Sequence, residues 1–484
     1  MKRFSRVLSL ILCMALLAGL LSTTAFASRK KTVKIVGLGD STSMGYLMDD
    51  FSWDHNHEDE IASQWSNCAL LKQYLEETWG LEVDAKDLTL TGSRTFELRA
   101  VLDKDFYNRL GTKPGYCNDH FKGPYGYLAC AGNDLHPYQS YEEMHKVFTE
   151  AISDADIITF DICMAEITSV LGAFSMPEYL YGYSTCYELL EAEGCQFLGQ
   201  SMEALRKTLD SLLNSAGLPA EQITGLVDGL LYGYASMCCH FSKSVELIYK
   251  LNPDVNLIVV GPYNAMHDVA LTTGDVTIDV APIWQVVLDA LANYSICMDK
   301  NSWRYRYADC RSGIETLQDA AAKGDWEGYK NFYYMICGSY DVEPTQQVKE
   351  NISAACANRT FQLESFTQVL GASGVFGGKE ALTNPNASPE EKEALALSVM
   401  FGLNHSAGLH PDKIGYWQKF DAIKHALLGC AAANGTYLNR ILEDGVGFVG
   451  TVVTSILGNK ESNTKLQTII KKAFTPVIRF SLFK

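Results

Sequence analysis

Short apolar runs alternate with stretches of helical periodicity along this chain. The apolar runs predict strands at about 33–38, 86–91, 157–162 and 256–260, with a further short strand at 304–307. Apolar residues at helical spacing predict helices at 62–79, 141–153 and 282–293. Gly80 is a natural C-cap for the first of these helices. Strands that alternate with helices favour an α/β fold built on a parallel, doubly wound sheet.

Two long stretches, 176–250 and 314–400, have mostly helical patterns and lie between the expected core elements. We therefore expect one domain over residues 28–430 with helical insertions in these two places. The insertions either form a cap over a site or add bulk to the domain. In a parallel sheet, ligands bind at the carboxyl ends of the strands, so residues at those ends are the first candidates for function.

The amino terminus has the pattern of a secretory signal. Three basic residues precede an apolar stretch at 7–21, and a small-x-small cleavage site follows at 25–27. We expect residues 1–27 to be removed and the protein to be secreted or associated with the cell envelope. No later stretch approaches the roughly 20 apolar residues that a membrane span needs.

The carboxyl-terminal segment, 431–484, differs in character from the rest. Its last part contains several lysines and an arginine among apolar residues, which predicts a basic amphipathic segment. Two interpretations remain open for it. The segment docks peripherally on an anionic membrane or cell-wall polymer, or it packs on the acidic body of the protein itself.

Charge and cysteine content narrow the class of protein. The formal charge of the whole chain is −17, and the leader holds three of its basic residues. Such an acidic chain repels phosphates, so nucleic acid is not an expected partner. Thirteen of the 14 cysteines follow the leader, which predicts disulfides in an exported protein, with at least one thiol left over. The alternative is that individual cysteines are small buried side chains.

No metal site is expected. The cysteines and histidines lack the spacing of a zinc site. Acids and histidines alternate over residues 54–60, but such a loop is more typical of a solvated surface than of a metal centre.

Candidate chemistry lies at the two ends of the domain. Gly39, Asp40 and Ser41 follow the first expected strand, and His410 with Pro411 precedes the last expected helix. A serine hydroxyl is a weak nucleophile, so an imidazole must take its proton, and the two residues need not be close in sequence. The plainer alternatives are that Ser41 is a helix N-cap and that His410 is an ordinary loop histidine.

These residues resemble the motifs of the SGNH, or GDSL-type, hydrolase family. Gly39-Asp40-Ser41 matches its first block, and His410-Pro411 followed by Gly415-Tyr416 matches its last, over core elements of roughly half the chain. The resemblance implies a three-layer, flavodoxin-like α/β fold. It also implies Ser41 as nucleophile, with Asp40 supporting its turn, and His410 as base. The N–H groups of Ser41 and Gly92 would form the oxyanion hole.

Two family positions depart from this pattern. Ala165 stands where the family has an asparagine that donates to the oxyanion, and Ala407 stands where it has the aspartate that orients the histidine. Losing one oxyanion donor costs about 100- to 1000-fold in rate, and losing the carboxylate costs up to about 10,000-fold. Asn133 is a candidate substitute donor, although an asparagine beside an aspartate is also typical of a turn.

The resemblance implies a secreted serine esterase that hydrolyses carboxylic esters, either O-acyl carbohydrates or short-chain lipid esters, without a cofactor. The substrate is then a small molecule or a polymer that carries the ester. The two alanine departures motivate a different function, that of a catalytically impaired binding protein of the cell envelope. A third hypothesis is a lipase whose helical insertions form a lid.

Overall fold

The computed structural model describes residues 32–51, 61–90, 93–111, 138, 140–161, 183, 185–215, 217, 220–311, 313–337, 343–362 and 410–431. The predicted leader and most of the predicted carboxyl-terminal segment 431–484 lie outside these ranges, so both remain expectations.

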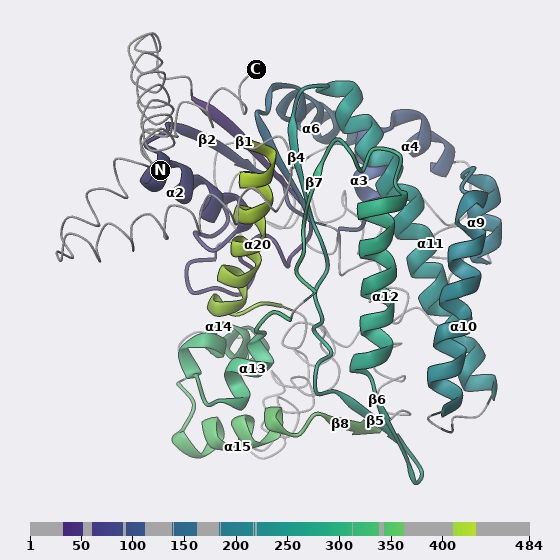
Figure 1. The fold of residues 1–484 in the computed structure, drawn as a ribbon. Coiled ribbons are helices and arrows are strands. Elements are labelled where there is room, and N and C mark those ends of the chain that lie inside the picture. The colour runs from purple at the N-terminus through teal and green to yellow at the C-terminus, as the bar shows by residue number, and fades with distance from the viewer. Residues whose placement is uncertain are drawn as a thin grey trace, which may run out of the picture.

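A five-stranded parallel sheet forms the centre of the fold (Figure 1). Its strands are β1 (Val33–Leu38), β2 (Val83–Asp87), β3 (Ile157–Asp161), β4 (Asn256–Val260) and β7 (Arg306–Ala308). They lie in the order β2-β1-β3-β4-β7, and every neighbouring pair is parallel. With the strands counted along the chain, this is the 2-1-3-4-5 order of flavodoxin-like sheets. The predicted α/β class with a doubly wound parallel sheet is confirmed.

Helices cover both faces of this sheet. On one face, α2 (Asn67–Trp79) packs on β1 and β2, and α20 (Lys413–Ala431) packs on β4, β7 and α2. Figure 1 shows α20 in front of the strands. The other face carries α3 (Thr95–Leu102), α6 (Tyr141–Asp154) and α11 (Ala220–Leu251), which pack on one another. The three layers place the carboxyl ends of β1 and β3 next to the start of α20.

The remaining helices surround this core. Near α3 lies α4 (Lys104–Gly111), and α9 (Cys186–Ala192), the short η2 (Gln196–Leu198) and α10 (Gly199–Ser215) lead into α11. Next, α12 (Ala281–Asn293) packs on α10 and continues as a π-helical turn, η3 (Tyr294–Met298). The predicted helical stretch 176–250 is thus mostly helical where it is described after residue 185, with breaks at 193–195 and at Gly217.

A second, smaller sheet was not predicted. Its strands are β5 (Ala270–Thr273), β6 (Val276–Asp279) and β8 (Thr360–Gln362), in the order β6-β5-β8. Between β7 and β8 the chain forms α13 (Leu317–Ala322), α14 (Trp326–Cys337) and α15 (Gln346–Ala357). Figure 1 shows this group below the main sheet. The other part of the stretch 314–400, from residue 363 on, lies outside the described ranges.

Two predicted elements have boundaries that differ from the structure by three residues or more, and the strand predicted at 304–307 spans Arg306–Ala308. The second strand spans Val83–Asp87 instead of 86–91, because Leu88 and Leu90 are buried in the connection that follows the strand and extend the apolar run. The first helix starts at Asn67 instead of residue 62, because the Ser66 side chain accepts a hydrogen bond from the Ala69 N–H and caps the helix there.

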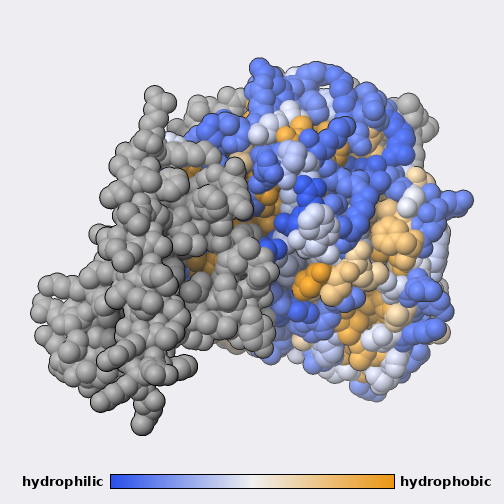
Figure 2. Space-filling view, turned by 45° about the horizontal axis from the view of Figure 1, so that its top comes forward, coloured by the Kyte–Doolittle hydropathy of each residue, from blue (hydrophilic) through white to orange (hydrophobic). Residues whose placement is uncertain are grey.

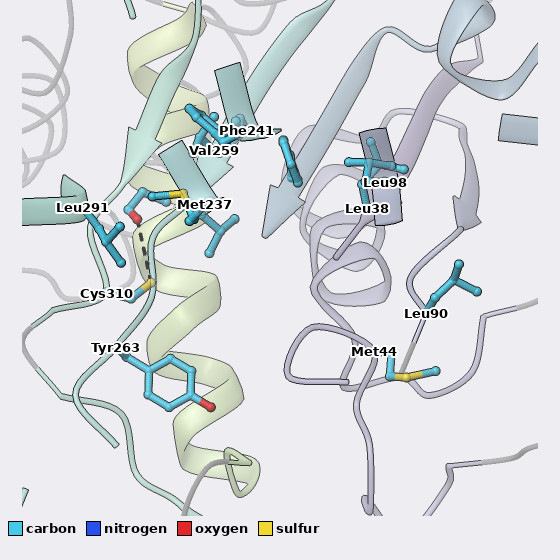
Figure 3. Close-up of a cluster of buried hydrophobic side chains, with 14 of the residues drawn as sticks. Leu38, Met44, Leu90, Leu98, Met237, Phe241, Val259, Tyr263, Leu291 and Cys310 are labelled. Carbon is cyan, nitrogen blue, oxygen red and sulfur yellow. Dashed lines mark hydrogen bonds between the residues drawn. The ribbon is translucent and has the colours of Figure 1, made fainter. Parts of the chain in front are cut away.

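Apolar side chains from both the sheet and the helices form one continuous core. Figure 3 shows Leu38 of β1 and Val259 of β4 among them, with Phe241 of α11 nearby. The Phe241 ring packs against Phe160 of β3, with centroids 5.5 Å apart. Because β1, β3 and β4 are covered on both faces, their sequences are nearly continuous apolar runs, which is why they were predictable.

None of the helices within the described ranges combines the length and the apolarity needed to cross a bilayer. Figure 2 shows one face of the molecule, on which hydrophilic residues surround patches of apolar ones. Single large apolar side chains are also exposed, as at Trp303, which is normal on protein surfaces.

Candidate active site

Ser41 lies in a tight turn directly after β1. The Asp40 carboxylate closes this turn, since its Oδ1 accepts hydrogen bonds from the Thr42 N–H and from the Thr42 hydroxyl, each at 2.8 Å. The Asp40 carbonyl accepts two more, from the Ser43 N–H at 3.1 Å and the Ser43 hydroxyl at 2.7 Å. Asp40 therefore supports the turn, whereas the Ser41 side chain remains available for another contact.

Only glycine fits at position 39, just before this turn. Gly39 has φ +151°, a conformation that side chains rarely adopt. A Cβ there would also lie 2.6 Å from Ser43 Oγ and 2.7 Å from Asp161 Cβ. The glycine of the Gly-Asp-Ser motif therefore lets the turn press against the end of β3.

The Ser41 side chain meets His410. Ser41 Oγ lies 2.7 Å from His410 Nε2, although 369 positions separate the two residues in the sequence. Both are largely buried, with 8% and 7% of their surface exposed. The ring of Tyr46, from the loop after the turn, lies against the imidazole with centroids 4.8 Å apart. The structure thus brings together the two residues that the sequence singled out at opposite ends of the domain.

The backbone around His410 is held by the start of α13 and by the segment that precedes it. The His410 carbonyl accepts from the Leu317 N–H at 3.0 Å, and the Asp412 N–H donates to the Glu315 carbonyl at 3.1 Å. Gly415 permits this close approach, because a Cβ there would overlap the Glu315 carbonyl oxygen. The glycine that matched the family pattern therefore has a packing reason.

Asp412 starts the last helix. Its Oδ1 accepts from the Gly415 N–H at 2.8 Å, as an N-cap side chain does. Burial raises the pKa of the Asp412 carboxyl, and the neighbouring Glu315 carboxyl raises it further. The role of Asp412 is therefore to cap the amino terminus of α20.

The geometry at Ser41 and His410 suits general-base chemistry. In a neutral imidazole with its proton on Nδ1, Nε2 accepts the Ser41 O–H, and 2.7 Å is within the range of such a hydrogen bond. The imidazole is then placed to take the hydroxyl proton as the serine oxygen attacks an electrophile.

A buried ion pair, which the sequence reasoning missed, lies beside this turn. Lys419 of α20 and Asp161 at the end of β3 are joined at 2.5 Å, and their side chains are 0% and 2% exposed. The Lys419 ammonium also donates to the carbonyl of Thr42, next to the serine, at 2.7 Å. The signal in the sequence was a lysine on the otherwise apolar stripe of α20, close to Tyr416 and Phe420.

Other predicted site residues fall outside the described ranges. These are Gly92 and Asn133, which were candidate oxyanion donors, and Ala165 and Ala407, the two family departures. The loop 54–60 is also outside. Within the described part of the chain, no group of three or more metal-ligating side chains comes together.

Disulfides are not confirmed for the cysteines that the structure describes. Eight of them are free thiols, and seven of the eight are buried: Cys68, Cys186, Cys195, Cys238, Cys239, Cys310 and Cys356, with Cys297 exposed. For these seven, the alternative of small buried side chains describes what is seen.

Similarity to known proteins is limited to remote structural matches. No protein-family model matches the chain, and no curated protein matches it. Among solved structures, an extracellular lipase from Streptomyces rimosus matches over 59% of this chain and 88% of that chain, with 9% identity and a TM-score of 0.29. Such a low score transfers neither fold nor function to this chain. The sheet order and the Ser41–His410 contact therefore carry the functional interpretation.

Proposed function

We propose that this protein is an exported serine esterase of the SGNH type. The observation that carries the proposal is the 2.7 Å contact between Ser41 Oγ and His410 Nε2 at the carboxyl end of a parallel sheet. Two observations argue against Ser41 as a helix N-cap and His410 as an ordinary loop histidine. Ser41 caps none of the described helices, and its hydroxyl faces the imidazole. The expected substrates are carboxylic esters, either O-acyl groups on carbohydrates or short-chain lipid esters.

The reaction follows from the positions of these two side chains. Ser41 Oγ attacks the ester carbonyl carbon while His410 Nε2 takes the hydroxyl proton. The tetrahedral intermediate collapses, and the imidazolium gives that proton to the departing alcohol. Water then attacks the acyl-serine carbonyl carbon while His410 Nε2 takes a proton from it. The second tetrahedral intermediate collapses, the bond to Ser41 Oγ breaks, the imidazolium returns its proton to Oγ, and the carboxylic acid leaves. In this proposal the N–H groups of Ser41 and Gly92 hold the oxyanion.

Labelling with a fluorophosphonate probe tests the proposal without a known substrate. The probe reacts with an activated serine, so the purified mature protein is expected to be labelled and Ser41→Ala is not. His410→Gln should slow labelling by about 10⁴-fold or more, since removing the base of such a pair has effects of that size. Ser153→Ala is a matched control, because Ser153 is exposed on α6 and should not alter labelling.

The same experiment separates the alternatives. A folded wild-type protein that takes no label would overturn the proposal and favour the non-catalytic binding protein. Labelling that survives Ser41→Ala would also overturn it. If labelling behaves as expected, a screen of acetylated carbohydrates against short-chain lipid esters identifies the substrate class. Activity that rises on lipid aggregates would favour the lipase with a lid.

A further inference from the structure

The Lys419 ammonium is fully satisfied by acceptors at the serine turn. An ammonium group has three N–H donors. Lys419 Nζ has three oxygen acceptors, the Thr42 carbonyl at 2.7 Å, the Thr42 hydroxyl at 3.3 Å and Asp161 Oδ2 at 2.5 Å. Its charge also lies 5.4 Å from the centroid of the Tyr263 ring, which Figure 3 shows beside α20. Two of the three acceptors belong to the residue that follows Ser41.

Three separate elements meet at this point. Asp161 ends β3, the strand that pairs with β1, and Lys419 comes from α20. Asn67, the first residue of α2, donates its side-chain N–H to Asp161 Oδ2 at 3.2 Å and its backbone N–H to the Ser43 carbonyl at 2.8 Å. The serine turn is therefore held from the sheet and from both helices of one face.

Folding stability alone gives a weak reason for this ion pair. Burying two charges carries a desolvation cost, and apolar replacement of such pairs is often neutral or stabilising. Consistent with that cost, burial raises the pKa of the Asp161 carboxyl to about 6 in spite of the adjacent Lys419 charge. What the pair does provide is a fixed donor at the Thr42 carbonyl.

The base and two supports of the nucleophile come from one helix and the residues directly before it. His410 lies just before α20, and within the helix the Tyr416 hydroxyl donates to the Ser41 carbonyl at 3.3 Å. One helical turn further on, Lys419 binds the Thr42 carbonyl. Because a helix is rigid over this length, these contacts tie the position of Ser41 to that of His410.

We propose that Lys419, anchored by Asp161, is a positioning residue that sets the distance between Ser41 and His410 through the Thr42 carbonyl. The inference rests on the proposed esterase function. Misplacing reacting groups by about 1 Å costs roughly 100-fold in rate. Loss of the Lys419 contacts should therefore slow the chemistry at Ser41 and leave the binding of a ligand nearly unchanged.

The decisive variant removes both charges at once. Lys419→Met alone leaves the Asp161 carboxylate buried without its cation, which is strongly destabilising. The double variant Lys419→Met/Asp161→Asn leaves no unpaired charge, and the asparagine keeps an acceptor for Asn67. Lys424→Met, at an exposed ion pair on the same helix, is the matched control and should label like the wild type.

Two quantities are measured on each folded variant, the limiting labelling rate at saturating fluorophosphonate and the probe concentration for half-saturation. In the double variant we expect the limiting rate to fall about 100-fold while the half-saturating concentration changes less than about twofold. If Lys419 served only to stabilise the fold, the limiting labelling rate of each variant would follow its unfolding midpoint, and a variant with the wild-type midpoint would label at the wild-type rate. A double variant that labels at the wild-type rate overturns the inference.

A second variant covers the case in which the double variant does not fold. Lys419→Arg keeps the cation next to Asp161, but a planar guanidinium does not place its donors where the ammonium has them. Slower limiting labelling is expected, and labelling at the wild-type rate overturns the inference.

The two proposals fail in different ways. An unlabelled wild type removes the esterase function itself, whereas equal labelling of wild type and variants removes only the role of Lys419.

Discussion

His240 is expected to make the fold sensitive to acid. It lies on α11 with 1% of its surface exposed, and its ring packs edge-on against Phe96 with centroids 5.1 Å apart. Arg99 Nη1 lies 3.1 Å from its Nδ1. Burial, and then the charge of Arg99, lower the pKa of His240 to about 3. The imidazole is therefore neutral in the folded protein throughout the neutral and mildly acidic range.

The pKa difference sets the size of the effect. In the unfolded chain a histidine has a pKa of about 6.5, so between pH 6.5 and 3 the unfolded state binds a proton that the folded state does not. The contribution of His240 to stability is thus complete above pH 6.5 and is lost as the pH falls. At pH 5 the loss is about 2 kcal/mol, because each pH unit below 6.5 corresponds to about 1.4 kcal/mol.

Other groups act in the opposite direction over the same range. The pKa of Asp161 is raised to about 6 and that of His267 is also raised, so both groups add stability to the folded state as the pH falls. The pH dependence of the total stability therefore does not report on His240 alone. The difference in the free energy of unfolding between the wild type and His240→Phe does, because the other groups are common to both proteins and an aromatic ring fits beside Phe96.

Urea unfolding of both proteins at pH 7 and pH 5 measures this difference. The free energy of unfolding follows from linear extrapolation at each pH. We expect the stability of the wild type relative to His240→Phe to fall by about 2 kcal/mol between pH 7 and pH 5. Glu193, whose pKa is lowered to about 2, stays ionised at both values and does not interfere. A relative stability that is the same at both pH values would refute the buried neutral imidazole.

Two other predictions test local features. Gly39→Ala should slow labelling of Ser41 by more than about tenfold through the clash at the turn. Gly80→Ala, at φ 61° with open space around it, should only lower stability by about 1 kcal/mol; equal labelling of both variants contradicts this reasoning. Iodoacetamide on the native protein, followed by peptide mass spectrometry, should modify Cys297 before the other seven described thiols, because they are buried. Earlier modification of a buried thiol contradicts the packing.

The sequence predicted those parts of the fold whose signals are local. The strands β1, β3 and β4 are covered on both faces, so each appears as an apolar run. The strand β2 was misplaced because its inner positions alternate with charged residues while apolar residues continue after it. The small sheet escaped prediction because β5, β6 and β8 have only three or four residues, and β8 joins from far along the chain.

The candidate site was predictable to the same extent. Ser41 and His410 were identified from short motifs, and each motif contains a glycine. The structure gives a physical reason for both glycines, since Gly39 has a positive φ and Gly415 lets the helix approach the Glu315 carbonyl. What the motifs did not contain is the contact distance between them. That distance depends on how α20 packs on the sheet, which is a long-range property that no local pattern encodes.

Lys419 shows most clearly why a buried ion pair cannot be predicted from local sequence. A lysine within an apolar stripe ordinarily marks the edge of the buried face, because a charge is almost never fully buried unless it is paired. Its partner Asp161 lies 258 positions away at a strand end, so neither residue reveals the pair by itself. Once the sheet order places β3 beside β1, the end of β3 must lie next to the serine turn. A carboxylate there, next to the helix that begins just after His410, then requires a cation, and the lysine on the inner face of α20 is positioned to supply it.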